Sequence, residues 1–282
     1  MTQIIVTVPG VTFDNMLFGD GWQLGELEGW WDTTKPRIGS DPRPEWHGDF
    51  GQDTAYLEPR FITVSGVFQS RENPDLVTSA RDVIAALHEA GEFDFTVSDG
   101  MVGRVTARLA SELLWDVDYA PGCASFEFTV KADDPRKYGQ KQTSSTGVPT
   151  AGVGIADPLL DPVQEGAAGN LGRVELTNTG TAPSEPMVRV TGGLSEGFEL
   201  LCIETGSVVR VTRPIPDGSV IDVDMGAGQV WVDQQSPLSA MYVPVAEWFS
   251  VKPGHTCTIQ FTPLGVVTGT PMMTVEFAEA SW

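Results

Sequence analysis

The sequence predicts a mainly β protein of two domains, on three observations. Its 282 residues are too many for one ordinary β-domain and enough for two that each bury a core. Short β-branched and aromatic segments recur along the chain between turn residues, and only one stretch has helical periodicity. We expect a β-sandwich-like N-terminal domain with one packed helix over residues 1–140, a linker or arm over 141–170, and a C-terminal β-sandwich over 171–282.

Six strands are expected in the N-terminal domain, because β-branched and aromatic residues there alternate with polar ones. The clearest is 123–131, where Phe126, Phe128 and Val130 share one face and the residues between them are polar. The other strands are expected at about 3–8, 57–69, 93–98, 102–110 and 112–118.

One helix is expected at about 74–90. Asn73 can cap it, Pro74 suits its first turn and Gly91 can end it. Its apolar stripe consists of Leu76, Ala80, Val83, Ile84 and Leu87, which are spaced as on one face of a helix. The pattern predicts a sheet packed by this helix.

Residues 139–170 contain many Gly, Pro, Ser and Thr and few aromatic residues, and are therefore expected to connect the domains or to form an extended arm. Beyond them, strands with intervening turns recur about every ten residues, as in an all-β sandwich. A turn is expected at 216–219, where Pro216 and Gly218 favour it. The strands are expected at 172–177, 186–192, 197–204, 207–213, 218–224, 228–233, 239–243, 255–262 and 271–277.

The formal net charge of −21 is shared by both halves of the chain. Such a surface repels phosphate backbones, so we expect no specific binding to nucleic acid; the charge serves solubility or lines a pore through which DNA slides. Cys123, Cys202 and Cys257 lack the spacing of a zinc site or a disulfide framework and are expected to be buried free thiols. The N-terminus resembles no signal peptide, so synthesis in the cytoplasm without a membrane anchor is expected.

The usual catalytic motifs are absent from the sequence, and we expect no enzymatic activity, cofactor or metal. His47, His88 and His255 lie in separate segments and are expected to be structural. Asp222 and Asp224 would share a strand face, as a glycosidase pair requires, but a solvated strand shows the same pattern.

Tryptophan and arginine gather in the N-terminal part, and both are common in buried interfaces. Core packing and a sugar-stacking platform are the alternatives. Trp231 and Trp248 raise the possibility of sugar contact in the second half. The candidate interface residues are Trp30, Trp31, Arg37, Arg43, Trp46 and Arg60.

The segments GELEGWWDTTKPRI (25–38), EPRFITVSGVF (58–68) and FEFTVKADDPRKYG (126–139), with the helix between them, resemble the N-terminal domain of siphophage distal tail proteins (Dit) and related phage minor tail proteins. In the second half, NTGTAPSEPMVRVTG (178–192) and WFSVKPGHTCTIQF (248–261) resemble strands of that family's C-terminal galectin-like or carbohydrate-module-like sandwich.

This resemblance implies a structural protein of the virion tail tip. It implies a hexameric ring that joins the tail tube to the baseplate and leaves a lumen for DNA, with the tail tube protein, the tape-measure protein and tail-associated or baseplate proteins as partners. The sequence leaves two other functions open. One is a carbohydrate-binding module for host adsorption. The other is a hydrolase of host surface polymers, in which some of the abundant carboxylates would be catalytic.

Overall fold

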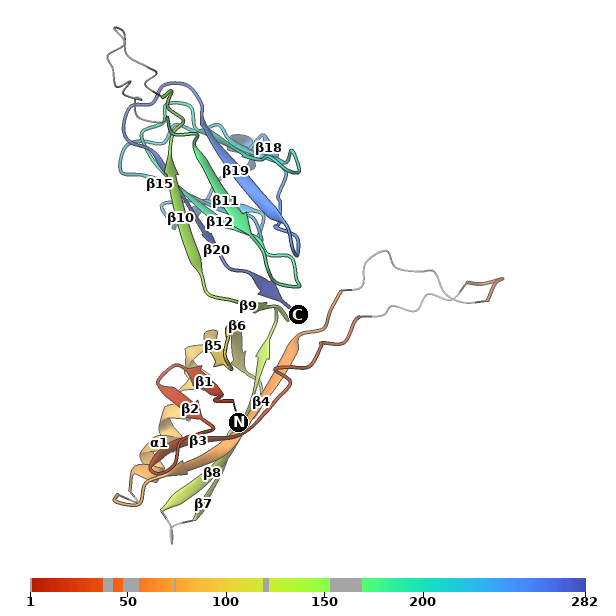
Figure 1. Cartoon of the computed structure of the whole chain (residues 1–282), viewed down its shortest axis with the longest axis vertical. Helices are drawn as coiled ribbons and strands as arrows, with labels where there is room; N and C mark the ends of the chain where they lie inside the picture. The colour runs from red at the N-terminus through yellow and green to blue at the C-terminus, as the bar shows by residue number, and fades with distance from the viewer. Residues whose placement is uncertain (1, 38–42, 48–55, 74, 119–121, 153–168) are drawn as a thin grey trace, which may run out of the picture. The chain divides into compact units, whose positions relative to one another are not determined.

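The computed structural model describes residues 2–37, 43–47, 56–73, 75–118, 122–152 and 169–282 (Figure 1). The chain forms two compact units, Met1–Gln140 together with Trp282, and Lys141–Ser281. None of the helices found in these ranges is long and apolar enough to cross a membrane.

The strands of the first unit form one antiparallel-rich sheet that closes on itself. Their order is β9-β6-β5-β1-β2-β3-β4-β8-β7, and a further pairing of β6 with β8 completes the ring. Strand β8 makes this closure possible because its first half pairs with β7 and its last residues pair with β6. The strands are β1 (Ile5–Val8), β2 (Val11–Asp14), β3 (Gly21–Glu28), β4 (Arg60–Gln69), β5 (Phe93–Ser98), β6 (Val102–Leu109), β7 (Leu114–Asp118), β8 (Cys123–Ala132) and β9 (Lys137–Tyr138).

The interior of this barrel is filled as the alternation on β8 predicts. Phe126, Phe128 and Val130 are all buried. Phe126 lies 5.1 Å from Phe13 and 5.5 Å from Trp22 between ring centroids, so aromatic side chains of β2, β3 and β8 meet in one core. The expected mainly β fold with a packed helix is confirmed, although its strands close into a barrel.

The predicted helix is present as two consecutive pieces, α1 (Leu76–Ala85) and α2 (Leu87–Ala90), and Gly91 ends it with a φ of 66°. The helix begins at Leu76 with Asp75 in the N-cap position, so Asn73 is not its capping residue, and Pro74 lies outside the described residues. The stripe is correct at Ala80, Ile84 and Leu87, which are buried. It is wrong at Leu76 and Val83, which are exposed while Val77 is buried, because the buried face repeats at 77, 80, 84 and 87.

The second unit consists of two facing sheets, as expected for a sandwich. One has the order β10-β20-β12-β15-β16-β17 and the other β11-β19-β13-β14-β18. Their strands are β10 (Gln142–Gly147), β11 (Arg173–Thr177), β12 (Met187–Thr191), β13 (Phe198–Cys202), β14 (Val208–Val211), β15 (Val220–Asp224), β16 (Gln229–Val232), β17 (Ser236–Pro237), β18 (Val245–Ala246), β19 (Thr256–Pro263) and β20 (Met272–Phe277), and β21 (Ala280–Ser281) follows.

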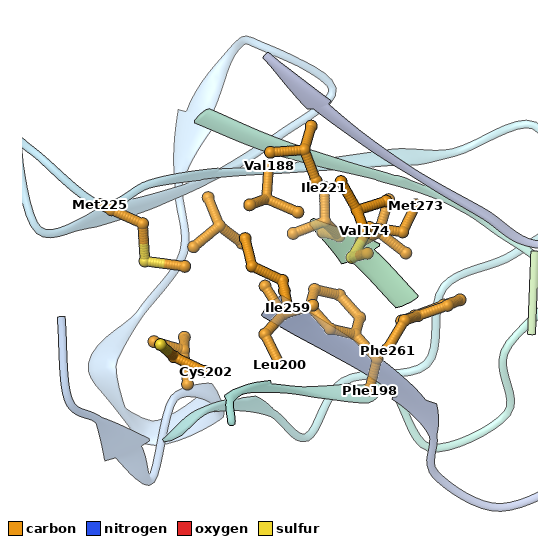
Figure 2. Packing of buried hydrophobic residues seen from close by; sticks show 14 of the residues in the cluster. Val174, Val188, Phe198, Leu200, Cys202, Ile221, Met225, Ile259, Phe261 and Met273 are labelled. Atoms are coloured by element: carbon orange, nitrogen blue, oxygen red, sulfur yellow. The ribbon is translucent and has the colours of Figure 1, made fainter. Parts of the chain in front are cut away.

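A single hydrophobic core lies between these sheets (Figure 2). Ile221 from one sheet and Leu200, Ile259 and Phe261 from the other are almost fully buried in it. The expected turn at 216–219 is present, with the Ser219 amide donating to the Pro216 carbonyl (3.1 Å) and Gly218 at a φ of 86°.

Two expectations for this half are wrong. Residues 142–147 of the expected linker form edge strand β10, paired with β20 through the backbone; its Ser- and Thr-rich side chains are mostly exposed and carry no apolar alternation. Residues 239–243 contain a 3₁₀ helix at Ala240–Tyr242 instead of a strand. The rest of the expected linker, 153–168, lies outside the described residues.

Candidate functional site

Two of the candidate interface residues are buried inside the first unit. Trp30 is 4% exposed and belongs to the barrel core. Arg60 is 1% exposed at the start of β4. The burial of Trp30 fits the core packing that the sequence left open for the tryptophans. An arginine can be buried where oxygen atoms accept its protons, although the Nη2 of Arg60 has no hydrogen-bond partner among the described residues.

Arg60 is held by backbone carbonyls. Its Nη1 donates to the carbonyl oxygens of Gly29 (2.8 Å), Trp30 (3.2 Å) and Asp32 (2.7 Å), and its Nε donates to that of Pro135 (3.0 Å). Burial lowers the pKa of Arg60 from its usual value, and Asp32 opposes this effect. The side chain thus ties the chain after β3 to the chain after β8.

Lys137 reinforces this tie. Its Nζ donates to the Trp30 carbonyl (3.2 Å) and lies 5.6 Å from the centroid of the Trp30 ring. Burial, followed by the charge of Arg60, lowers the pKa of Lys137 from its usual value. Two cations therefore converge on the turn that leads from β3 into the next segment.

The remaining candidate interface residues, Trp31, Arg37, Arg43 and Trp46, are exposed. Trp31 is 51% exposed with its indole Nε1 donating to Asp99 (2.9 Å), and Trp46 is 79% exposed. In Figure 1 the chain after β3 and the chain before β4 run side by side, held by the Arg37 amide donating to Tyr56 (2.6 Å) and the Glu58 amide donating to Lys35 (2.8 Å). Tyr56 and Phe61 add two further exposed rings.

We call the described residues 31–37, 43–47 and 56–58 the aromatic arm. Exposed tryptophan and tyrosine together with arginine are the residue types that protein interfaces bury at their centre. A solvated domain surface rarely carries so many large rings close together in the sequence. The arm is therefore the strongest candidate binding surface of the first unit.

The second unit has a pocket of about 400 Å³ on the outer face of its larger sheet. Met187, Arg189, Asp222, Trp231, Gln234 and Glu276 line it. The sheet register brings these residues together, because Arg189 pairs with Asp222 across β12 and β15, Asp222 with Trp231 across β15 and β16, and Met187 with Glu276 across β12 and β20. Arg189, Asp222 and Glu276 were not recognised from the sequence as members of this pocket.

The polar groups of this pocket are fixed in place. Arg189 Nε donates to Asp222 at 2.7 Å, and this hydrogen bond raises the pKa of Arg189 from its usual value. Lys141 Nζ lies 2.9 Å from a Glu276 oxygen. An indole ring beside ordered carboxylates and a guanidinium suits a ligand with apolar faces and hydroxyl groups, as sugars have.

Trp248 is separate from the pocket, since it is not among the described residues that line it. Its side chain is partly buried against the core of the sandwich. Its Nε1 lies 3.2 Å from the position that a Cβ on Gly228 would occupy, so the ring packs against the turn between β15 and β16. The structure therefore does not bring Trp231 and Trp248 into one site.

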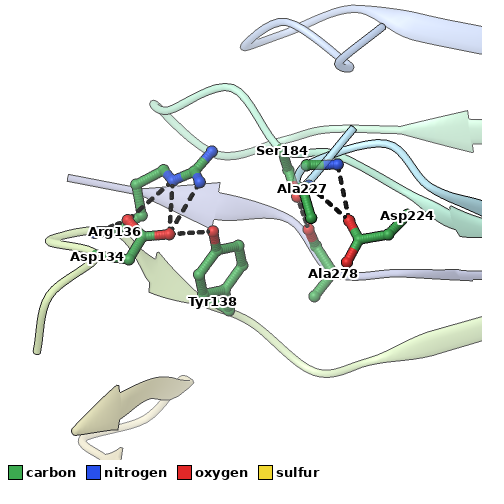
Figure 3. Close-up of polar contacts among 8 residues, drawn as sticks. Asp134, Arg136, Tyr138, Ser184, Asp224, Ala227 and Ala278 are labelled. Atoms are coloured by element: carbon green, nitrogen blue, oxygen red, sulfur yellow. Dashed lines mark hydrogen bonds and ion pairs between the residues drawn. The ribbon is translucent and has the colours of Figure 1, made fainter. Parts of the chain in front are cut away.

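The suspected carboxylate pair has structural partners. Asp222 is paired with Arg189, whereas Asp224 accepts hydrogen bonds from the amides of Gly226 (2.9 Å) and Ala227 (2.8 Å) and so caps a turn (Figure 3). His47, His88 and His255 are exposed on three separate segments. In the parts of the chain that the structure describes, the one group that could hold a metal ion is Cys202, Glu204 and Cys257.

Comparison with known proteins adds the family context. Residues 179–280 match the family model described as the C-terminal domain of the siphovirus-type tail component. No curated protein matches the chain.

Solved structures match over 98% of this chain and 98% of theirs. One is the crystal structure of the Dit protein of phage SPP1, described as a paradigm of the hub adsorption apparatus of phages that infect Gram-positive bacteria, with a TM-score of 0.63 at 16% identity. Two are structures of the phage p2 baseplate in its activated conformation, with Ca (TM-score 0.52, 9% identity) and with Sr (TM-score 0.51, 10% identity). These findings confirm the expected resemblance to distal tail proteins.

Proposed function

We propose that this chain, which resembles siphophage distal tail proteins over almost its whole length, is a structural subunit of a phage tail tip. Six copies form a ring that joins the tail tube to the baseplate and leaves a central lumen for DNA. The chain is made in the host cytoplasm and ends in the virion. The observation that carries this proposal is the similarity of both units, in one chain, to the SPP1 protein over 98% of each chain.

The physical features of the chain support an assembly role without enzymatic activity. The suspected catalytic carboxylates Asp222 and Asp224 are engaged in an ion pair and a turn. The aromatic arm provides a surface of the kind that closes interfaces between subunits or with the tube, tape-measure and baseplate proteins. The net charge of −21 suits a wall along which DNA slides without binding.

The mass of the purified full-length chain, alone and mixed with its neighbouring tail proteins, tests this proposal. Mass photometry should give six times the chain mass of 30.3 kDa, and electron microscopy should show rings. Trp46→Ala should lower the ring fraction, whereas Phe18→Ala should not, since Phe18 is also exposed but lies outside the arm. A chain that stays monomeric with every tail protein would refute the ring.

A carbohydrate-binding role in host adsorption is a second candidate, and the Trp231 pocket favours it. Titration calorimetry with host wall polysaccharide should then show binding that Trp231→Ala abolishes. Trp248→Phe is the matched control, because Trp248 does not line the pocket, and it should keep the affinity of the wild type. Equal binding by Trp231→Ala and the wild type would exclude this pocket.

A further inference from the structure

Two buried thiols of the second unit lie unusually close together. Cys202 Sγ and Cys257 Sγ are 2.9 Å apart, although 55 positions separate the residues in the chain. Both side chains belong to the sandwich core, and Figure 2 shows Cys202 among its hydrophobic neighbours. Two unbonded sulfur atoms do not normally come so near.

The sheet register explains this proximity. Cys202 ends β13 and pairs with Ile259 on the neighbouring strand β19. Cys257 lies two residues before Ile259, and side chains two apart on a strand share a face. The Ile203 amide, which donates to the Thr258 carbonyl (3.0 Å), keeps the two strands together beside the thiols.

We propose that Cys202 and Cys257 form a disulfide when the folded protein meets a peroxide, and that this bond locks β13 to β19. A disulfide requires a sulfur separation of about 2.0 Å, so the two atoms must approach by roughly another 0.9 Å. Small side-chain rotations supply such a distance. The proposal concerns the chain itself and goes beyond its role in the tail tip.

The chemistry balances with hydrogen peroxide as the oxidant. The Cys202 sulfur attacks one peroxide oxygen, the O–O bond breaks, and a sulfenic acid and one water form. The Cys257 sulfur then attacks the Cys202 sulfur, the S–O bond breaks, and a second water leaves. Two thiols are oxidised by two electrons and one peroxide is reduced, with both thiol protons ending in the two water molecules.

Burial and the neighbouring Cys202 raise the pKa of the Cys257 thiol well above its usual value. Because both thiols are nearly inaccessible, a small peroxide reaches them more readily than a bulky disulfide reagent does.

A metal site is the rival use of this cluster. Glu204 is the third group that could serve as a ligand, but its oxygens already accept hydrogen bonds from the Thr258 amide (2.7 Å) and hydroxyl (2.7 Å). Two thiolates bound to one zinc ion, each at about 2.3 Å in a tetrahedral site, also need a wider separation than the sulfurs show. The geometry favours the disulfide.

The test is treatment of the purified full-length chain with hydrogen peroxide, followed by thiol alkylation in denaturant and mass spectrometry. The wild type should lose two hydrogens and yield a linked peptide pair containing Cys202 and Cys257. Methionine oxidation adds mass and is thereby distinguished. Cys202→Ser and Cys257→Ser should lack the linked pair, and Cys123→Ser, which removes the thiol of the first unit, should keep it.

A second measurement follows the stability of the second unit. Closing a loop of this length should raise its thermal midpoint on the order of 10 °C, and a reducing agent should reverse the rise. The proposal is overturned if both thiols remain fully alkylated after oxidation of the wild type. It is also overturned if native mass spectrometry finds a bound zinc ion that protects them.

Discussion

Replacing Arg60 by methionine tests whether this residue supports the fold or an interface. Methionine keeps an unbranched apolar side chain but removes the guanidinium that donates to the carbonyls of Gly29, Trp30, Asp32 and Pro135. The partly buried carbonyls of Gly29, Asp32 and Pro135 each lose a donor at a cost of about 1–3 kcal/mol, while the Trp30 carbonyl keeps its hydrogen bond from Lys137. The relief of burying no charge offsets part of this sum. We expect a net loss of about 3 kcal/mol.

Calorimetry of the dilute chain should detect this loss. A unit of this size changes its melting temperature by roughly 3–5 °C per kcal/mol, so the transition of the first unit should fall by about 10 °C. The melting temperature of Arg60→Lys should fall by an intermediate amount, since an ammonium group retains the charge but lacks the forked donors of a guanidinium. Arg104→Met is the control, because it removes only an exposed ion pair with Asp94 (3.2 Å), worth at most about 1 kcal/mol.

The opposite outcome is also informative. If Arg60→Met melts like the wild type at every protein concentration but assembles poorly, then Arg60 acts at an interface as the sequence first suggested. The structural reasoning from its four carbonyl partners would then be refuted.

Three further predictions concern other contacts within the two units. Asn178→Ala should destabilise the second unit by about 2–4 kcal/mol in urea unfolding, because Asn178 is fully buried and its Nδ2 donates to the carbonyls of Ala182 (2.8 Å) and Val251 (2.9 Å). Burial would raise the pKa of Asp134, but hydrogen bonds from Arg136 and Tyr138 outweigh burial and hold this pKa below its usual 3.8 (Figure 3). The wild type should therefore be more stable than Asp134→Asn above pH 3.8. This difference in stability should vanish when the pH is lowered below that value. Gly66→Ala should abolish soluble folding of the first unit, because the added Cβ would lie 2.1 Å from the Gln23 carbonyl oxygen. Gly226→Ala should express normally, because the nearest atom to its added Cβ is 3.4 Å away.

The strands that sequence reasoning identified are those with one buried and one solvated face. On β4, Ile62 and Val64 face the buried interior of the barrel while Thr63 and Ser65 lie on the other face, so the alternation predicted this strand. β2 and β3 were not predicted, and β3 contains an irregularity between Leu24 and Glu26 that breaks its period.

The candidate site was only partly predictable for a related reason. Composition indicated that tryptophan and arginine gather near residues 30–60, but it could not separate Trp30 and Arg60, which are buried, from Trp31 and Trp46, which are exposed. Arg60 is buried because carbonyl groups from distant segments accept its hydrogen bonds. No local sequence pattern indicates that these segments meet. The Trp231 pocket likewise depends on the register of four strands.

The closed ring of strands in the first unit bears on how this protein behaves when many copies are crowded together. An open sheet presents rows of unused amides and carbonyls to which a foreign strand can attach, which is a common start of aggregation. Because β6 returns to β8, most of these rows are internally satisfied in the residues that the structure covers, and β7 is left at one margin. Within the first unit, this closure leaves fewer edges open to indiscriminate strand addition.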